Sequence, residues 1–126
     1  MIINKVLLVD DEDDIRFVAE ISLRDVGGLE TFVASSGPEG LQSAEENLPD
    51  LIVLDMMMPG MDGMETLRQL RSNPATDHIP VIFMTARAQV HEITSYIEAG
   101  ALAVITKPFD PMSLHEQVKQ AAASLN

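Results

Sequence analysis

Short apolar runs alternate with amphipathic stretches along the whole chain. Five runs have the length of strands, at residues 6–9, 29–33, 51–54, 81–84 and 102–105. The first, third and fourth are apolar without interruption, which is typical of strands covered on both faces in a parallel sheet. The other two are more polar, so we expect them near the edges of the sheet.

Between these runs, apolar residues recur at the three- and four-residue spacing of helices that pack on a sheet. The five predicted helices carry Ile15, Val18, Ala19, Ser22 and Val26; Leu41, Ala44 and Leu48; Leu67 and Leu70; Val90, Ile93 and Ile97; and Leu114, Val118, Ala121 and Leu125. Asp62 with Glu65 indicates a capping box for the third helix, and Asp110 before Pro111 indicates an N-cap for the fifth. Five alternating units predict an α/β fold, an open parallel sheet with helices on both faces.

Composition narrows the class of protein. The 126 residues show no linker or repeat, so we expect a single domain over residues 1–126. The absence of cysteine excludes disulfides, thiolate catalysis and Cys-ligated metals. No run approaches the ~20 apolar residues of a membrane span and no signal peptide is evident, so we expect a cytoplasmic location without membrane contact. A net charge of −12 would repel nucleic acid.

Polar side chains follow four of the five predicted strands. Asp10 and Asp11 follow the first strand, Asp55 the third, Thr85 the fourth and Lys107 the fifth. Ligands bind at this edge in open α/β sheets. With neighbouring strands ~4.8 Å apart, three carboxylates would converge, and they cannot all stay ionised without a cation. Oxygen ligands alone favour Mg²⁺, with Mn²⁺ as the alternative.

A carboxylate in such a site can also act as a nucleophile and form an aspartyl-phosphate. Asp55 is the candidate nucleophile, Lys107 supplies a compact positive charge, and the Thr85 hydroxyl can donate a hydrogen bond to a phosphoryl oxygen. Phosphoryl transfer depends mainly on positioning and on neutralising charge, so this small set of residues suffices.

Three other functions compete with this hypothesis. A flavodoxin-type cofactor binder requires a loop rich in Gly, Ser or Thr after the first strand, where this chain has acids from Asp10 to Asp14. A haloacid-dehalogenase-type phosphatase requires a second acid two residues after the nucleophile, a spacing that Asp11 and Asp13 fit and Asp55 does not. The third alternative is a phosphorylation-independent interaction module with the same fold.

Five segments together resemble the receiver domain of two-component response regulators, the CheY-like superfamily. They are Val9–Glu12, Leu54–Gly63, Met84–Arg87, Gly100–Ala101 and Thr106–Phe109. The resemblance extends over essentially the whole chain. It implies a flavodoxin-like (βα)5 doubly wound parallel sheet with strand order 2-1-3-4-5, and phosphorylation of Asp55.

The resemblance also implies a role for each motif residue. The metal ligands would be Asp10, Asp11, Asp55 and the backbone carbonyl of Met57. Thr85 and Lys107 would contact the phosphoryl group. The secondary positions are Ala86, Arg87, Pro108, which would follow Lys107 through a cis peptide, and Val104. Val104 departs from the family, which usually has an aromatic switch residue there, and this departure bears on the route from Thr85 to the outer surface.

The partners follow from the same resemblance. The phosphoryl donor would be a histidine kinase or a histidine phosphotransfer domain. An unidentified downstream protein would bind a face built from the fourth helix, fifth strand and fifth helix. The chain would be a monomer or a phosphorylation-dependent dimer, and no output domain is expected after the fifth helix. It would take part in its own phosphorylation and autodephosphorylation without turning over an external substrate.

Overall fold

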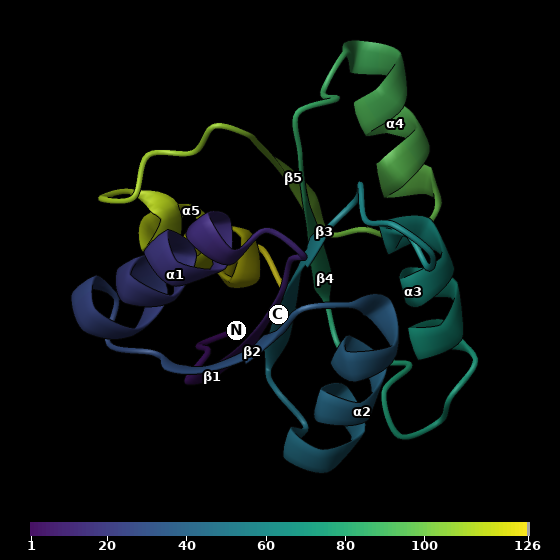
Figure 1. Ribbon diagram of the computed structural model, residues 1–126, viewed down its shortest axis with the longest axis horizontal. Helices are drawn as coiled ribbons and strands as arrows, with labels where there is room; N and C mark the ends of the chain where they lie inside the picture. The colour runs from purple at the N-terminus through teal and green to yellow at the C-terminus, as the bar shows by residue number, and fades with distance from the viewer. Residues whose placement is uncertain (126) are drawn as a thin grey trace.

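Strands and helices alternate along the chain (Figure 1) in the computed structural model, which describes residues 1–125. The strands are β1 (Lys5–Val9), β2 (Glu30–Ala34), β3 (Leu51–Asp55), β4 (Val81–Thr85) and β5 (Ala103–Thr106). The helices are α1 (Asp13–Ile21), α2 (Gly37–Asn47), α3 (Gly63–Arg71), α4 (Val90–Glu98) and α5 (Leu114–Ala123), and a π-helical turn, η1 (Ser22–Val26), continues α1.

All neighbouring strands of the sheet are parallel, in the order β2-β1-β3-β4-β5. Helices α1 and α5 cover one face, and α2, α3 and α4 lie on the other (Figure 1). The register places Val9 beside Leu54, and Asp55 beside Met84. The predicted α/β class and the flavodoxin-like strand order are therefore confirmed, and the carboxyl ends of β1, β3 and β4 meet at one edge.

Each face of the sheet has its own apolar core. On β1, Val6 and Leu8 pack toward α1 and α5, while Leu7 and Val9 pack toward the α2–α3 layer. Every residue of β3 and β4 is buried, whereas β2 and β5 are buried only in part. Burial of each large aliphatic side chain contributes about 1.5–3 kcal/mol. The uninterrupted apolar runs thus form the central strands, as predicted, and the more polar runs form the edges.

The ends of two helices differ from the prediction. Leu48 was expected on the packed face of α2, but it lies past the end of that helix, with a φ of 46° and 54% of its surface exposed. Pro49 follows, and a residue before proline is disfavoured in the helical region. At the end of α1, the helix continues as the wider π-helical turn η1. Val26, which was expected on the buried face of the helix, is exposed there.

The start of α5 was also predicted too early. Asp110 was expected to be the N-cap, but the helix begins at Leu114 after Ser113. Asp110 instead closes a turn, because its side chain accepts the Met112 N–H at 2.9 Å and its carbonyl accepts the Leu114 N–H at 3.0 Å.

The capping box predicted for α3 is half present. The Asp62 carboxylate accepts the Glu65 N–H at 2.9 Å, but the Glu65 side chain pairs with Arg68 and accepts a hydrogen bond from Gln69. At α4 the other half of such a box is present, since the Gln89 N–H donates to the Glu92 side chain at 3.2 Å. Within residues 1–125, no helix is both long and apolar enough to cross a membrane.

Candidate functional site

The loop after β1 turns sharply and carries the first acids of the site. The Asp10 N–H donates to the carbonyl of Ala34 at 3.1 Å, which continues the ladder with β2. The Asp10 side chain folds back and accepts the Glu12 N–H at 2.9 Å. Asp10 is thereby fully buried, at the point where the chain leaves the sheet and α1 begins.

Asp55 is the last residue of β3 and is only 1% exposed. Its carboxylate accepts the Met57 N–H at 3.1 Å, while the next amide, that of Met56, donates to the carbonyl of Met84 at 3.1 Å. Gly63, at the start of α3, lies directly behind: an added Cβ there would be 2.7 Å from the Asp55 carbonyl oxygen. The backbone at Asp55 is therefore held between β4 and α3.

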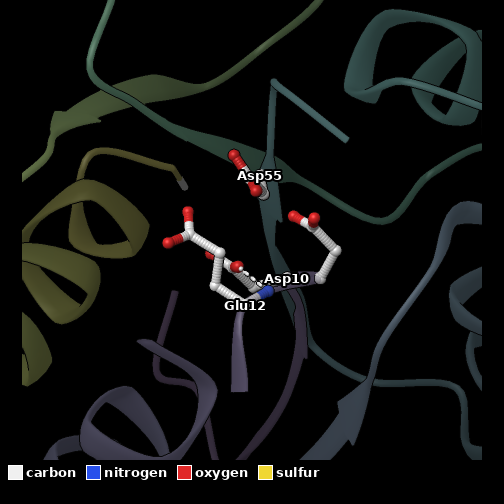
Figure 2. A group of neighbouring side chains, drawn as sticks. Asp10, Glu12 and Asp55 are labelled. Atoms are coloured by element: carbon white, nitrogen blue, oxygen red, sulfur yellow. Dashed lines mark hydrogen bonds between the residues drawn. The ribbon is translucent and has the colours of Figure 1, made fainter. Parts of the chain in front are cut away.

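Four carboxylates gather at this edge of the sheet. One oxygen each from Asp10, Asp11, Glu12 and Asp55 lies within 4.8 Å of all the others. Figure 2 shows the labelled side chains of Asp10 and Glu12 reaching from the loop after β1 toward Asp55 on β3. The three acids predicted from the sequence are thus brought together. From the sequence, Glu12 is expected mainly as an acid of the first helical turn, with assistance to Mg²⁺ as the less favoured alternative; the structure places its carboxylate in the cluster.

Lys107 is the cation of this cluster. Its Nζ is 2.9 Å from Asp10 Oδ2, 3.4 Å from Asp55 Oδ1 and 3.5 Å from Glu12 Oε1. The Lys107 N–H donates to the carbonyl of Thr85 at 2.9 Å, which fixes the end of β5 against the end of β4. The peptide bond to Pro108 is cis, as the resemblance implied. A lysine from the fifth strand thus reaches carboxylates on the first and third.

The surroundings change the acidity of both central groups. Burial raises the pKa of Asp55 to about 7, and the charge of Asp10 acts in the same direction, while Lys107 and the Met57 N–H oppose it. For Lys107, desolvation lowers the pKa, but the hydrogen bond and charge of Asp10, together with Asp55, outweigh it and raise the pKa. The positive charge of Lys107 therefore does not neutralise the four carboxylates of the cluster.

The donor set fits a hard divalent cation. Asp11 Oδ1 and Asp55 Oδ2 are buried without a hydrogen-bond partner in the described part of the chain. A buried carboxylate oxygen without a partner carries a desolvation cost that a bound cation removes. All the available ligand atoms are oxygens, which Mg²⁺ prefers.

The remaining predicted residues lie around this cluster. Thr85 is fully buried at the end of β4, one position after the partner of Asp55, and its hydroxyl accepts the Arg87 N–H at 3.0 Å. Ala86 and the Arg87 side chain are exposed. Val104 lies beside Phe83 in the sheet. The rings of Phe83 and Tyr96, which is on α4, pack edge to face with their centroids 5.6 Å apart.

The phosphatase alternative needs Asp13 as an acid–base group beside an Asp11 nucleophile. The Asp13 side chain is instead 89% exposed and pairs with Arg16 in the first turn of α1. Asp13 is not among the acids whose carboxylate oxygens gather with Asp55. This geometry does not favour a role for Asp13 in catalysis.

Comparisons with known proteins agree on one family. The sequence model of the protein family described as "response regulator receiver domain" matches residues 6–119 of this chain. The chain is 38% identical over 115 residues to the alkaline phosphatase synthesis transcriptional regulatory protein PhoP of Bacillus subtilis, covering 91% of this chain and 47% of that protein. It is also 38% identical over 116 residues to the response regulator PleD of Caulobacter vibrioides, covering 91% of this chain and 25% of that protein.

Solved structures give the same result. The chemotaxis protein CheY4 of Vibrio cholerae superposes with a TM-score of 0.87 at 29% identity, covering 94% of this chain and 98% of that one. A response regulator from Desulfuromonas acetoxidans superposes with a TM-score of 0.87 at 26% identity, covering 98% and 99%. The chain spans about half or less of the length of the two curated relatives, and nearly the full length of these structures.

Proposed function

This chain belongs to the response regulator receiver domains, and from that premise we propose that it accepts a phosphoryl group on Asp55 in a Mg²⁺-dependent reaction. The observation that carries the proposal is the buried Asp55 carboxylate, which is 3.4 Å from Lys107 Nζ and shares a cluster with three other acids. Three buried carboxylate oxygens in that cluster, Asp10 Oδ2, Asp11 Oδ1 and Asp55 Oδ2, lack a hydrogen-bond partner among the described residues, and Asp10 Oδ2 has only its ion pair with Lys107. This combination suits a nucleophile that works beside a bound cation.

In the proposed reaction, an ionised oxygen of Asp55 forms a bond to phosphorus. The bond from phosphorus to the donor's histidine nitrogen breaks, and its electron pair passes to the imidazole ring. Because burial holds the pKa of Asp55 at about 7, a nearby positive charge favours the ionised form that attacks. Hydrolysis reverses the modification: water attacks phosphorus, and the Asp55 carboxylate and inorganic phosphate are released.

Asp10, Asp11, Asp55 and the backbone carbonyl of Met57 would hold Mg²⁺. When bound, the ion supplies positive charge to the carboxylates and to the phosphoryl oxygens, which lowers the cost of bringing them together. Glu12, whose carboxylate lies in the same cluster, adds negative charge that favours cation binding. Mn²⁺, which also accepts oxygen ligands, is the expected substitute.

Lys107 and Thr85 respond to the new charge. In the proposed reaction, the Lys107 ammonium gives up its contact with Asp10 and pairs with a phosphoryl oxygen. The Thr85 hydroxyl, which now accepts the Arg87 N–H, donates to another phosphoryl oxygen. Ala86 and Arg87 follow Thr85 and are exposed, and they would set access to the phosphoryl group.

The signal passes through the face made of α4, β5 and α5. Thr85 precedes the loop into α4, and Lys107 directly follows β5, so movement of either residue shifts elements of that face. A histidine kinase or a histidine phosphotransfer domain would donate the phosphoryl group, and an unidentified protein would read the α4-β5-α5 face. With Val104 on β5, the transmission does not use an aromatic side chain at that position.

Labelling with acetyl phosphate tests the proposal. Intact mass spectrometry should find one added phosphoryl group on the wild type in Mg²⁺, and little in the presence of a chelator. Asp55→Asn should take up none, whereas Asp14→Asn, at an exposed acid in the first turn of α1, should label like the wild type. Equal labelling of wild type and Asp55→Asn would remove Asp55 as the acceptor.

A further inference from the structure

Arg16 contacts the acidic loop, yet the proposed reaction gives it no part. It lies at the end of the first turn of α1 and reaches back toward the end of β1. Its Nη1 donates to the carbonyl oxygen of Asp10 at 2.9 Å, and its Nη2 pairs with the Asp13 carboxylate. Only 20% of the Arg16 side chain is exposed, so this arginine is part of the packed structure behind the site.

Asp10 is consequently held at both ends by cations. Lys107 contacts its carboxylate at 2.9 Å, and Arg16 contacts its carbonyl. Only the first contact competes with a phosphoryl group, because Lys107 Nζ also lies 3.4 Å from Asp55, the proposed acceptor. The contact from Arg16 is made to the main chain and can persist while Lys107 changes partner.

The geometry of the guanidinium matters as much as its charge. A planar fork with several N–H donors can hold a carbonyl and a carboxylate at once, whereas an ammonium acts as a single point charge. Arg16 joins the Asp10 carbonyl to Asp13 at the start of α1, and so fixes the angle at which the chain leaves the sheet. The Glu12 N–H that donates to the Asp10 carboxylate belongs to the same short turn.

We propose that Arg16 is a positioning residue for the cation site: it fixes the main chain at Asp10, so that the Asp10 carboxylate keeps facing Asp55 when Lys107 leaves it. The proposal rests on the proposed function, because it assumes that the cluster binds Mg²⁺. It extends the set of residues that govern the site to one that the strand-end motifs do not contain.

Positioning and charge predict opposite effects on Mg²⁺ affinity. If Arg16 acted only through its charge, its removal would make the acidic loop more negative and Mg²⁺ would bind more tightly. If Arg16 orients Asp10, its removal loosens a ligand and Mg²⁺ binds more weakly. The direction of the change therefore separates the two roles.

Calorimetric titration with MgCl₂ measures this direction. We expect Arg16→Gln to weaken Mg²⁺ binding by about tenfold, as is usual for the loss of a group that orients a metal ligand. Arg16→Lys, which keeps the charge and loses the fork, should recover only part of the affinity. The matched control is Arg24→Gln, which removes one charge from the half-exposed Arg24 paired with Glu20 and should leave the affinity within about twofold.

Hydrogen exchange of the metal-free protein gives a second readout. The Glu12 amide, which donates to Asp10, should exchange about tenfold faster in Arg16→Gln than in the wild type, because the turn opens more often. The amide of Val53, in the centre of β3, reports global unfolding. Its protection should change less than that of Glu12 if the effect is confined to the loop.

Unchanged or tighter Mg²⁺ binding by Arg16→Gln would overturn the proposal, as would equal loss of protection at Glu12 and Val53. These outcomes are informative only when the wild type itself binds Mg²⁺ and is labelled on Asp55. A wild type that binds no Mg²⁺ refutes the proposed function, whereas a wild type that binds Mg²⁺ while Arg16→Gln binds equally well refutes only the role of Arg16.

Discussion

Asp55 combines two properties that rarely coincide in a carboxyl group. It is buried, which favours the neutral form, and it is surrounded by other acids, which act in the same direction and hold its pKa at about 7. Nucleophilic attack requires the charged form. At the residue scale, the proposed phosphoryl transfer therefore depends on neighbouring positive charge, from Lys107 and from the proposed cation.

This pKa predicts a pH dependence of stability in the metal-free protein. The Asp55 carboxyl ionises near 3.8 when unfolded and at about 7 in the native state, so the native state keeps a proton that the unfolded state loses. The stabilisation is fully present below the lower value and is lost as pH rises through the upper one. Relative to Asp55→Asn, the wild type should lose roughly 2 kcal/mol of unfolding free energy between about pH 5 and pH 8.

Urea unfolding in the presence of a chelator measures this difference. Comparison with Asp55→Asn removes the contribution of other titrating groups, provided both proteins unfold in two states. Parallel pH profiles for the two proteins would contradict the raised pKa.

Loss of Lys107 should destabilise the metal-free protein. Its ammonium contacts the buried carboxylates of Asp10 and Asp55, and removal of one partner of a buried ion pair typically costs about 3–5 kcal/mol. Lys107→Met should therefore lower the unfolding free energy by about 3 kcal/mol, and saturating Mg²⁺ should restore part of it. Lys119→Met, at an exposed lysine on α5, is the control and should change stability little. Similar losses in both variants would argue against a charge-compensating role for Lys107.

At the scale of elements, the site depends on how closely α3 approaches β3. The Gly63 position has no room for a side chain, since a Cβ would be 2.7 Å from both the Asp55 carbonyl oxygen and the Met56 Cα. Gly63→Ala should cost about 1–3 kcal/mol and displace the backbone that carries Asp55, so labelling by acetyl phosphate should fall as well. Arg68→Ala, on the exposed face of the same helix, should affect neither measurement. If Gly63→Ala were as stable and as fully labelled as the wild type, the close approach of α3 to the backbone at Asp55 would not matter for the site.

The sequence was sufficient to predict the elements and the strands that carry the site. Uninterrupted apolar runs at β3 and β4 can be satisfied only between two helix layers, and the more polar β2 and β5 could only be edges. Once those strands are parallel, Asp10, Asp55 and Lys107 must end at one edge.

The boundaries and some members of the site were beyond the sequence pattern. Leu48 continues the periodicity of α2, but the Pro49 that follows it ends the helix, and the pattern of apolar residues does not register this. Val90 continues the periodicity of α4, yet its side chain is exposed, and none of the nine residues of that helix is buried. Arg16 joins the site through its contact with the Asp10 carbonyl in the turn between β1 and α1, and the spacing of apolar residues does not specify the shape of that turn.

At the scale of the whole molecule, 20 acids face 8 lysines and arginines. Any salt therefore stabilises the fold by screening repulsion, and a specific cation site should add to that effect. In thermal unfolding, MgCl₂ should raise stability more than NaCl of equal ionic strength, by about 2.7 kcal/mol at a hundredfold excess over Kd. The surplus should disappear in Asp11→Asn and persist in Asp14→Asn. Equal stabilisation by MgCl₂ and NaCl would show that the salts act only by screening charge repulsion, and would contradict a specific cation site.

The central claim is that a divalent cation in this cluster brings Asp55 into its ionised, nucleophilic form. Calorimetry of MgCl₂ binding in buffers with different ionisation enthalpies tests it most directly, because it counts the protons released. We predict that one Mg²⁺ binds with release of a fraction of a proton at about pH 6.5, and with almost none at about pH 9, where Asp55 is already ionised. Binding without any proton release at the lower pH, or no binding at all, would contradict the account.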